Sequence, residues 1–330
     1  MNNRREFFKK IGLGVMAVAI GLNLMAAYTK PEPEKLITQP EEKVSVGDEP
    51  QSVYDFPVTV KLPAVLNGNP GAGKRVRMTT PDWTETSVYH TLYLPKDWNR
   101  NAKLPVIVEY AGNGGYIKGL DVSHGTVEDC CLGYGLTSGS GAIWITMPFV
   151  EVKNGLKQNC TVWWGDIEET KRYCTETVRD VCEQFGGDPN RVILAGFSRG
   201  AIACFYIGLH DDQIAGLWSG FFCHSHLDGV RENWGYPGAD RASALIRLKR
   251  LGNRPVWISQ ENTTDDIQQY LKETGVTGRF TFASLPYPNH TIQWILRDLP
   301  IRLEAINWWN SKNIQAQHRY ENDFKTVEII

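Results

Sequence analysis

A serine between two glycines carries the clearest chemical signal in the sequence. Residues 196–200 read GFSRG, which is a G-x-S-x-G motif. A short apolar run, Val192–Ala195, precedes the motif, and an alanine-rich segment that is predicted to be helical follows it. In a strand–turn–helix context, such a motif holds the serine on a tight, strained turn with its hydroxyl exposed and a helix N-terminus beneath it. The pattern therefore predicts that Ser198 acts as a nucleophile.

The elements around this motif alternate between strand-like and helix-like segments, which is typical of an α/β fold with a largely parallel sheet. Several strands are short continuous apolar runs, as expected where helices cover both faces of a sheet. The predicted strands are Val88–Leu94, Leu104–Tyr110, Ala142–Met147, Val192–Ala195, Ile214–Trp218, Pro255–Ser259 and Phe280–Leu285. The predicted helices are Asp166–Phe185, Arg199–Leu209, Arg241–Leu251, Thr264–Thr274 and Ile292–Trp309.

The serine motif in this order of elements resembles that of the α/β-hydrolases. The chain most closely resembles their secreted polyhydroxybutyrate-depolymerase-like and feruloyl-esterase-like branch, and the resemblance extends from about Val88 to Trp309. It implies an α/β-hydrolase fold with a mostly parallel central sheet and helices on both faces. It also implies a serine hydrolase that cleaves carboxylic esters through an acyl-enzyme and needs no cofactor.

The resemblance also implies an oxyanion hole, which needs a second backbone N–H from the loop after an early strand. The loop that follows Leu104–Tyr110 reads AGNGGY. The N–H of Asn113, or alternatively that of Gly114, would bind the oxyanion together with the N–H of Arg199. Ala111 departs from the histidine that is common in the family at this point. The alternative is that the glycines of this loop only allow a turn and that the loop has no catalytic role.

His290 stands where the family carries its general base, in the loop after the last predicted strand. An imidazole at this point in the chain order could reach Ser198 and take its proton. Of the other six histidines, only His224 and His226 compete with His290 for this role.

The acid that orients the base is expected between Ser198 and His290 in the sequence, usually after the predicted strand Pro255–Ser259. Glu261 lies in that loop and has no structural explanation of its own. Thr263 and Asp266 have the spacing of a capping box, so Asp265 and Asp266 are explained by the start of a helix. We therefore expect Glu261 to be the acid, followed by Asp265 and then Asp228.

Two other features have a possible chemical role. His224 and His226 have a spacing that could hold a metal, although a pocket wall is the better interpretation and no metal is expected. Trp163 and Trp164 could be aromatic platforms for a sugar or phenolic substrate, or core residues. The alternatives to an esterase are a peptidase of the same fold, an inactive binding protein of that fold, and a metal-dependent hydrolase.

The composition is that of a packed globular protein. The chain has 330 residues, of which 42% are hydrophobic, enough to bury a core in one large domain. Its 35 Lys+Arg and 37 Asp+Glu give a formal net charge of −2, so no overall positive field would attract nucleic acid. The expected partner is a small-molecule or polymeric ester.

The N-terminus has the order of an export signal. Arg4 and Arg5 precede an apolar run, Ile11–Ala27, which resembles a twin-arginine signal. We expect residues 1–27 to direct the chain to the periplasm or outside the cell, with membrane contact only through this segment if it stays uncleaved. Residues 28–55 are rich in Pro, Glu and Lys and are predicted to be a linker, and 56–330 the hydrolase domain.

The seven cysteines fit an oxidising compartment, where disulfides can form. Their odd number leaves at least one thiol unpaired. Cys130, Cys131 and Cys160 lie in loop-like sequence and are the better disulfide candidates. Cys174, Cys182 and Cys204 are expected to be small buried residues in helices.

Overall fold

The computed structural model describes residues 51–325, with side chains up to residue 312. The predicted export segment, 1–27, and most of the predicted linker, 28–55, lie outside this range. Within it, no helix combines the length and the hydrophobicity needed to span a bilayer.

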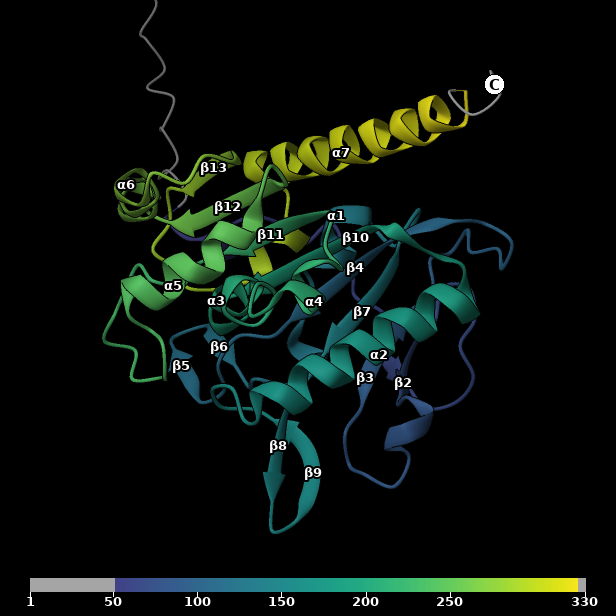
Figure 1. Ribbon diagram of the computed structural model, residues 1–330. Helices are drawn as coiled ribbons and strands as arrows, with labels where there is room; N and C mark the ends of the chain where they lie inside the picture. The colour runs from purple at the N-terminus through teal and green to yellow at the C-terminus, as the bar shows by residue number, and fades with distance from the viewer. Residues whose placement is uncertain (1–50, 326–330) are drawn as a thin grey trace, which may run out of the picture. The chain divides into compact units, whose positions relative to one another are not determined.

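A sheet of nine strands forms the centre of the described structure (Figure 1). In spatial order its strands are β1 (Val65–Leu66), β2 (Arg75–Met78), β3 (His90–Tyr93), β7 (Ile143–Met147), β4 (Leu104–Tyr110), β10 (Gly187–Phe197), β11 (Gly220–His224), β12 (Pro255–Glu261) and β13 (Arg279–Leu285). From β7 to β13 all neighbours are parallel, whereas β3 is antiparallel to both β2 and β7. The prediction of a mostly parallel sheet is confirmed.

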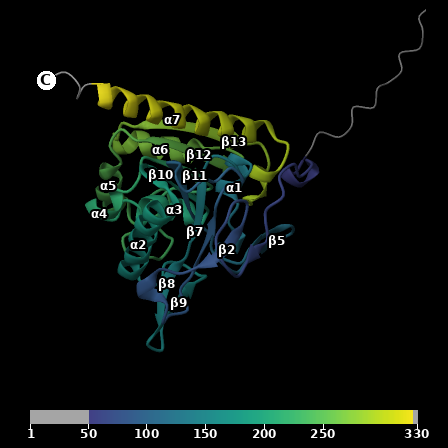
Figure 2. The same ribbon diagram turned by 90° about the vertical axis from the view of Figure 1, so that its right-hand side faces the viewer.

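Helices cover both faces of this sheet. The helices on one face are α2 (Ile167–Phe185), α3 (Arg199–Tyr206), α4 (Asp212–Ala215), α5 (Arg241–Leu248) and α6 (Asp265–Thr274), and those on the other are α1 (Leu132–Thr137), the 3₁₀ helix η5 (Gln293–Leu296) and α7 (Pro300–Lys325). Figure 2 shows α7 and α3 on opposite sides of the sheet. Along β4, Val106 and Val108 pack toward α2 and α3, while Ile107 packs toward α1 and α7. This alternation buries both faces of a central strand.

The predicted strand Ile214–Trp218 is wrong. Its first residues belong to the short helix α4, and the strand β11 begins only at Gly220. The Asp211 carboxylate accepts hydrogen bonds from the N–H groups of Gln213 and Ile214, which caps the helix. A short apolar run fits a buried helix as well as a strand, and the acidic cap was the signal that distinguishes them.

The predicted single helix Ile292–Trp309 is also wrong. The chain forms η5, leaves the helical conformation and starts again as α7, with Pro300 as the first residue. Proline is well suited to this first position because its missing N–H would have no partner there. It also disfavours the helical conformation of the preceding Leu299.

Two hairpins were not predicted. β5 (Tyr116–Lys118) pairs with β6 (Asp121–Ser123), and β8 (Phe149–Lys153) pairs with β9 (Leu156–Cys160). The turn of the second hairpin is Asn154-Gly155, and both residues have positive φ values, 53° and 78°. Asn-Gly between two strand-like runs is a strong hairpin signal. Three further short 3₁₀ helices are η2 (Pro81–Trp83), η3 (Val127–Asp129) and η4 (Lys249–Leu251).

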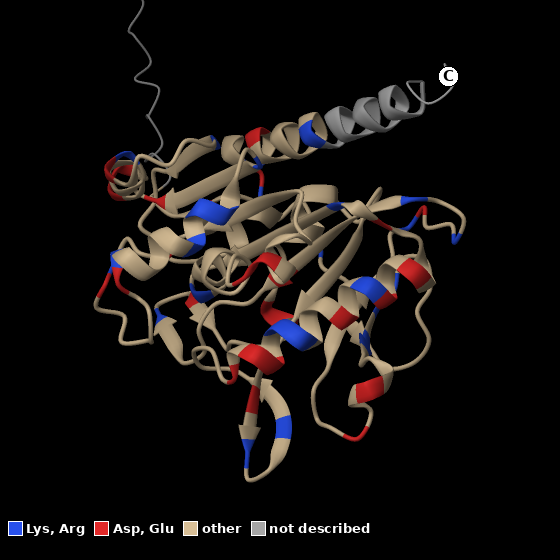
Figure 3. Cartoon of the chain, in the orientation of Figure 1, with Lys and Arg blue, Asp and Glu red and all other residues tan. Residues whose placement is uncertain are grey.

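Acidic and basic residues are interspersed along α2 (Figure 3). Lys171 pairs with Glu168 at 2.8 Å, and Arg172 pairs with Glu169 at 2.8 Å. The surface of this helix is therefore locally balanced in charge.

The chain joins the domain earlier than predicted, because the last residues of the predicted linker 28–55 pack against it. A 3₁₀ helix, η1 (Val53–Asp55), has Val53 fully buried. The Ser52 hydroxyl and the Val53 N–H both donate to Asn289 Oδ1 at 3.0 Å. The Tyr54 hydroxyl hydrogen-bonds to Asp121 Oδ1 at 3.0 Å. We call residues 52–54 the N-terminal clasp.

All seven cysteines are buried free thiols, so the disulfide candidates Cys130, Cys131 and Cys160 do not pair. Their sulfur atoms approach three different backbone carbonyls, those of Glu109, Ile292 and Val162, at 3.9, 3.6 and 3.0 Å. The three thiols therefore point to different partners, and the local sequence around each cysteine does not indicate this.

Candidate active site

The Ser198 turn joins strand β10 to helix α3. Ser198 has φ 54° and ψ −115°, a strained conformation for a residue with a side chain. A Cβ atom at Gly196 would collide with the carbonyl oxygen of Gly200, and one at Gly200 would collide with that of Tyr110. The glycines of the motif therefore let strand and helix approach closely enough to present the serine.

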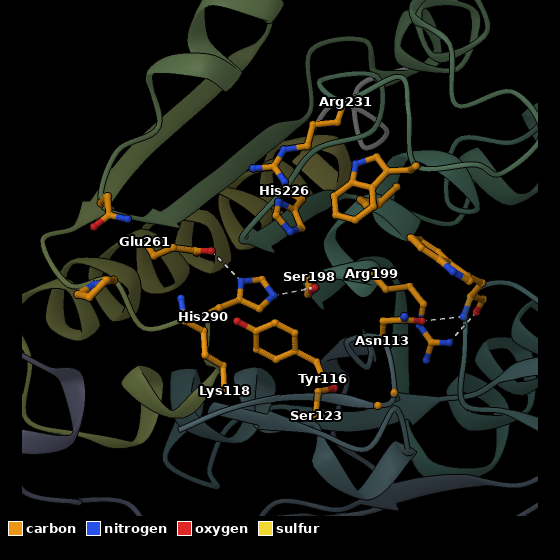
Figure 4. Close-up of a pocket in the computed structure, with 17 residues that line it drawn as sticks. Asn113, Tyr116, Lys118, Ser123, Ser198, Arg199, His226, Arg231, Glu261 and His290 are labelled. Carbon is orange, nitrogen blue, oxygen red and sulfur yellow. Dashed lines mark hydrogen bonds and ion pairs between the residues drawn. The ribbon is translucent and has the colours of Figure 1, made fainter. Parts of the chain in front are cut away.

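His290 and Glu261 form a hydrogen-bonded chain with this serine (Figure 4). His290 Nε2 lies 2.9 Å from Ser198 Oγ, and His290 Nδ1 lies 2.7 Å from Glu261 Oε1. The three side chains come from the carboxyl ends of neighbouring parallel strands and the loops that follow them, which meet at one edge of the sheet. The structure thus brings together the three residues singled out as nucleophile, base and acid.

Glu261 is the carboxylate on the imidazole, and the two alternatives are not. Asp228 lies 2.7 Å from Arg247 Nε and accepts a hydrogen bond from Tyr236, and Asp265 begins helix α6. Burial by itself would raise the pKa of Glu261. The hydrogen bond with His290 and the electrostatic interactions with His224 and His290 outweigh burial and hold this pKa well below its usual range. Its carboxylate therefore stays ionised at neutral pH.

The predicted capping box at Thr263 is wrong in detail. The N-cap of α6 is Thr264, and its side chain makes no capping hydrogen bond. The Thr263 hydroxyl instead accepts a hydrogen bond from the Asp265 N–H at 3.2 Å. The helix still begins at Asp265, so its carboxylate lies in the first helical turn.

Ser225 is a site residue that sequence reasoning missed. Its hydroxyl donates to Glu261 Oε2 and lies 3.1 Å from His290 Nδ1. Ser225 and the next residue, His226, both have positive φ values, 63° and 99°. The only available signal was the position of Ser225 directly after the apolar run that forms β11.

The two competing histidines have other surroundings. His224 is buried, and its ring nitrogens hydrogen-bond to Ser259 Oγ at 3.0 Å and to the Thr291 carbonyl at 3.1 Å. The ring of His226 lies between those of Trp234 and His290, with centroids 5.1 and 5.2 Å away. Burial lowers the pKa of His226 to about 3, so this ring is neutral at pH 7. Residues 51–312 contain no cluster of three side chains suited to a metal.

Asp121 stabilises the loop that carries His290 through a hydrogen bond to its backbone. The sequence did not indicate this residue either. Asp121 Oδ2 accepts the His290 N–H at 3.0 Å, and Oδ1 accepts the Tyr54 hydroxyl. The ring of Tyr116 packs edge-on against His290 with centroids 4.9 Å apart. These contacts link the imidazole to the β5–β6 hairpin and to the N-terminal clasp.

Two residues that could supply oxyanion-hole N–H groups line the same cavity as the serine. Asn113 and Arg199 line this cavity with Ser198, and within the described structure their N–H groups donate to no other residue. The N–H of Gly114 is occupied, because it donates to the Thr161 carbonyl at 2.8 Å. Of the two donors considered from this loop, the geometry therefore favours Asn113 over Gly114.

The cavity has a volume of about 590 Å³, which is within the usual range for small-molecule sites. Aromatic and charged side chains share its wall. Besides Ser198, His290 and Glu261, side chains in this wall include those of Asn113, Tyr116, Lys118, Trp163, Arg199, His226, Arg231 and Trp234. Trp164 is instead buried in the core, so only one of the two neighbouring tryptophans is available to a ligand.

The chain is similar to solved esterase structures. One, from a study of two fungal esterases of Rhizomucor miehei, has a TM-score of 0.51 and 14% identity over 80% of this chain and 87% of that chain. Thermogutta terrifontis esterase 2 phosphorylated by paraoxon has a TM-score of 0.48 and 11% identity over 73% and 94%. A thermostable esterase has a TM-score of 0.42 and 16% identity over 71% of this chain, which spans 61% of that esterase's length.

No family model matches the chain, and no curated protein matches it in sequence. The likeness to the Rhizomucor miehei structure, together with the sheet order described above, shows that the chain has the α/β-hydrolase fold.

Buried histidines give a testable pH dependence of stability. Burial lowers the pKa of His90 to about 3 and that of His224 to about 4, against an ordinary value of 6.5. Below pH 6.5 the unfolded chain binds protons that the folded chain does not, so the free energy of unfolding should fall as the pH decreases. Each histidine contributes a slope of up to about 1.4 kcal/mol per pH unit.

Chemical denaturation between pH 7 and pH 5 measures this slope. His90→Gln should remove the contribution of one histidine to the slope of unfolding free energy against pH. A stability that does not depend on pH in this range would contradict the prediction.

Proposed function

We propose that this α/β-hydrolase-fold chain is a serine hydrolase that cleaves carboxylic esters through an acyl-enzyme. The observation that carries the proposal is the hydrogen-bonded chain from Ser198 Oγ through His290 to Glu261, at the wall of a cavity. An inactive protein of the same fold would have no need to keep this geometry or the strained conformation of Ser198.

The proposed reaction begins with attack of Ser198 Oγ on the acyl carbon. His290 Nε2 takes the hydroxyl proton and then gives it to the departing alcohol oxygen, and Glu261 holds the other ring N–H and stabilises the imidazolium. The N–H groups of Asn113 and Arg199 bind the oxyanion, and such a donor contributes about 3 kcal/mol to transition-state stabilisation. A water molecule then attacks the acyl-enzyme by the reverse proton transfers. No cofactor takes part in these steps.

For the substrate and its location we propose an ester on a polysaccharide, or a polyester, hydrolysed after export. The twin-arginine pattern and the following apolar run support export. Trp163 and Trp234 in the cavity wall support a substrate with a ring that can pack against an aromatic face.

Turnover of short-chain nitrophenyl esters, together with labelling by a fluorophosphonate probe, tests the proposal. We expect hydrolysis that persists in a metal chelator, and a covalent label on Ser198. Hydrolysis of peptide amide substrates, tested beside the esters, would identify a peptidase. Comparing hydrolysis of acetylated xylan, feruloylated xylan and a polyester would identify the polymeric substrate. A folded protein that neither turns over esters nor takes the label would contradict the proposal.

Glu261→Gln is expected to lower kcat by about 10⁴-fold, because a glutamine neither holds the productive tautomer of His290 nor stabilises the imidazolium. Steady-state kinetics on a nitrophenyl ester measures this loss. Asp265→Asn is the matched control: it alters only the first turn of α6 and should affect stability slightly and kcat little. If the two variants had equal kcat values, the acid would be assigned wrongly.

A further inference from the structure

The charges that line the cavity beside Ser198 are unbalanced. Three of the residues that line it are cationic, Lys118, Arg199 and Arg231, and the only carboxylate residue among those lining it is Glu261. That carboxylate is already engaged by His290 and Ser225. The cavity therefore presents a net positive charge, although the whole chain carries a formal charge of −2.

Arg199 supplies a buried part of this positive charge. The residue is 1% exposed, and its guanidinium donates only to carbonyls, those of Trp163 at 2.6 Å and Gly125 at 3.3 Å. Its Nε has no partner within the described residues. Burial lowers its pKa to about 10, so the group stays charged at neutral pH.

Another buried arginine of this chain is instead paired with a carboxylate. Arg247 is 7% exposed and pairs with Asp228 at 2.7 Å. An unpaired buried charge is costly to stability, and its field is weakly screened. The charge of Arg199 is not neutralised by a carboxylate, so it adds a positive potential inside the cavity.

Lys118 and Arg231 supply charges at the rim. In the view of Figure 4 their side chains lie on either side of His290. Both residues are exposed, and neither forms an ion pair with a carboxylate of the described structure. The Arg231 guanidinium lies over the ring of Trp234, 5.5 Å from its centre, which leaves its N–H groups available to a ligand.

From these charges we infer that the preferred substrate is an ester with a carboxylate group, which Lys118 and Arg231 bind while Ser198 attacks the ester carbonyl. The inference rests on the proposed serine-hydrolase function and names its substrate class. Arginine and lysine pair with a carboxylate through charge-assisted hydrogen bonds, and the field of Arg199 favours entry of the same charge. The carboxylate can belong to the acyl part or to the alcohol part of the ester.

Two pairs of isosteric esters test the inference and separate the two positions of the charge. For the acyl part, the mono-nitrophenyl ester of succinate is compared with the corresponding succinamate. For the alcohol part, 4-acetoxybenzoate is compared with 4-acetoxybenzamide. We expect kcat/KM to be about tenfold higher for the anionic member of at least one pair, a preference that decreases with added salt.

The charge-removing variant Lys118→Gln/Arg231→Gln should lower this ratio several-fold, and the preference that remains is due to the field of Arg199. Lys153→Gln is the matched control, because Lys153 is an exposed lysine on the β8–β9 hairpin outside the cavity wall, and it should keep the ratio. Equal kcat/KM values within both pairs, or a preference that the double variant leaves unchanged, would overturn the inference while leaving ester hydrolysis in place. Failure to hydrolyse even the neutral esters would instead overturn the proposed function, and this inference with it.

Discussion

Replacing Ser198 with alanine is expected to lower ester turnover by about a millionfold. The hydroxyl oxygen is the atom that forms the acyl-enzyme, and only background catalysis by oxyanion binding would remain. The fold should persist, because Ser198 lies at the wall of the cavity and its replacement by alanine leaves no hole in the hydrophobic core.

Steady-state kinetics on a nitrophenyl ester, with the denaturation midpoint as a check of folding, measures this outcome. The fluorophosphonate label should disappear in the same variant. A folded Ser198→Ala protein that kept a tenth of the activity would refute Ser198 as the nucleophile.

His290→Ala should match the loss in Ser198→Ala, because the nucleophile depends on the base 2.9 Å away to remove its proton. The two residues act as a unit, so the double variant should be no slower than either single variant. Kinetics of the three variants on one ester tests this. Normal turnover in His290→Ala together with a loss in His226→Ala would move the base to the loop after β11.

The sequence predicted the parts of the site that depend on chain order. Ser198 and His290 follow strands, Glu261 is the last residue of β12, and parallel strands bring such positions to one edge of the sheet. The strands β4 and β13 were predicted to within one residue. These predictions succeeded because local hydrophobicity and strand direction are both readable from the chain.

The residues that the sequence did not indicate act across long distances in the chain. Asp121 bonds to the backbone of His290, 169 residues away, and Ser225 bonds to Glu261, 36 residues away. Neither has a local pattern that separates it from an ordinary loop residue. The strand predicted at Ile214–Trp218 failed for a different reason, since hydrophobicity alone does not distinguish a buried helix from a buried strand.

The N-terminal clasp sets a boundary for recombinant production and domain fusion. A gene trimmed to start at Phe56 would remove the whole predicted linker, 28–55, and keep the whole predicted domain. It would also delete the hydroxyl and N–H donors of Ser52, Val53 and Tyr54 that hold Asn289 and Asp121 beside the imidazole. A start at Gln51 retains them, so a fusion partner belongs upstream of that residue.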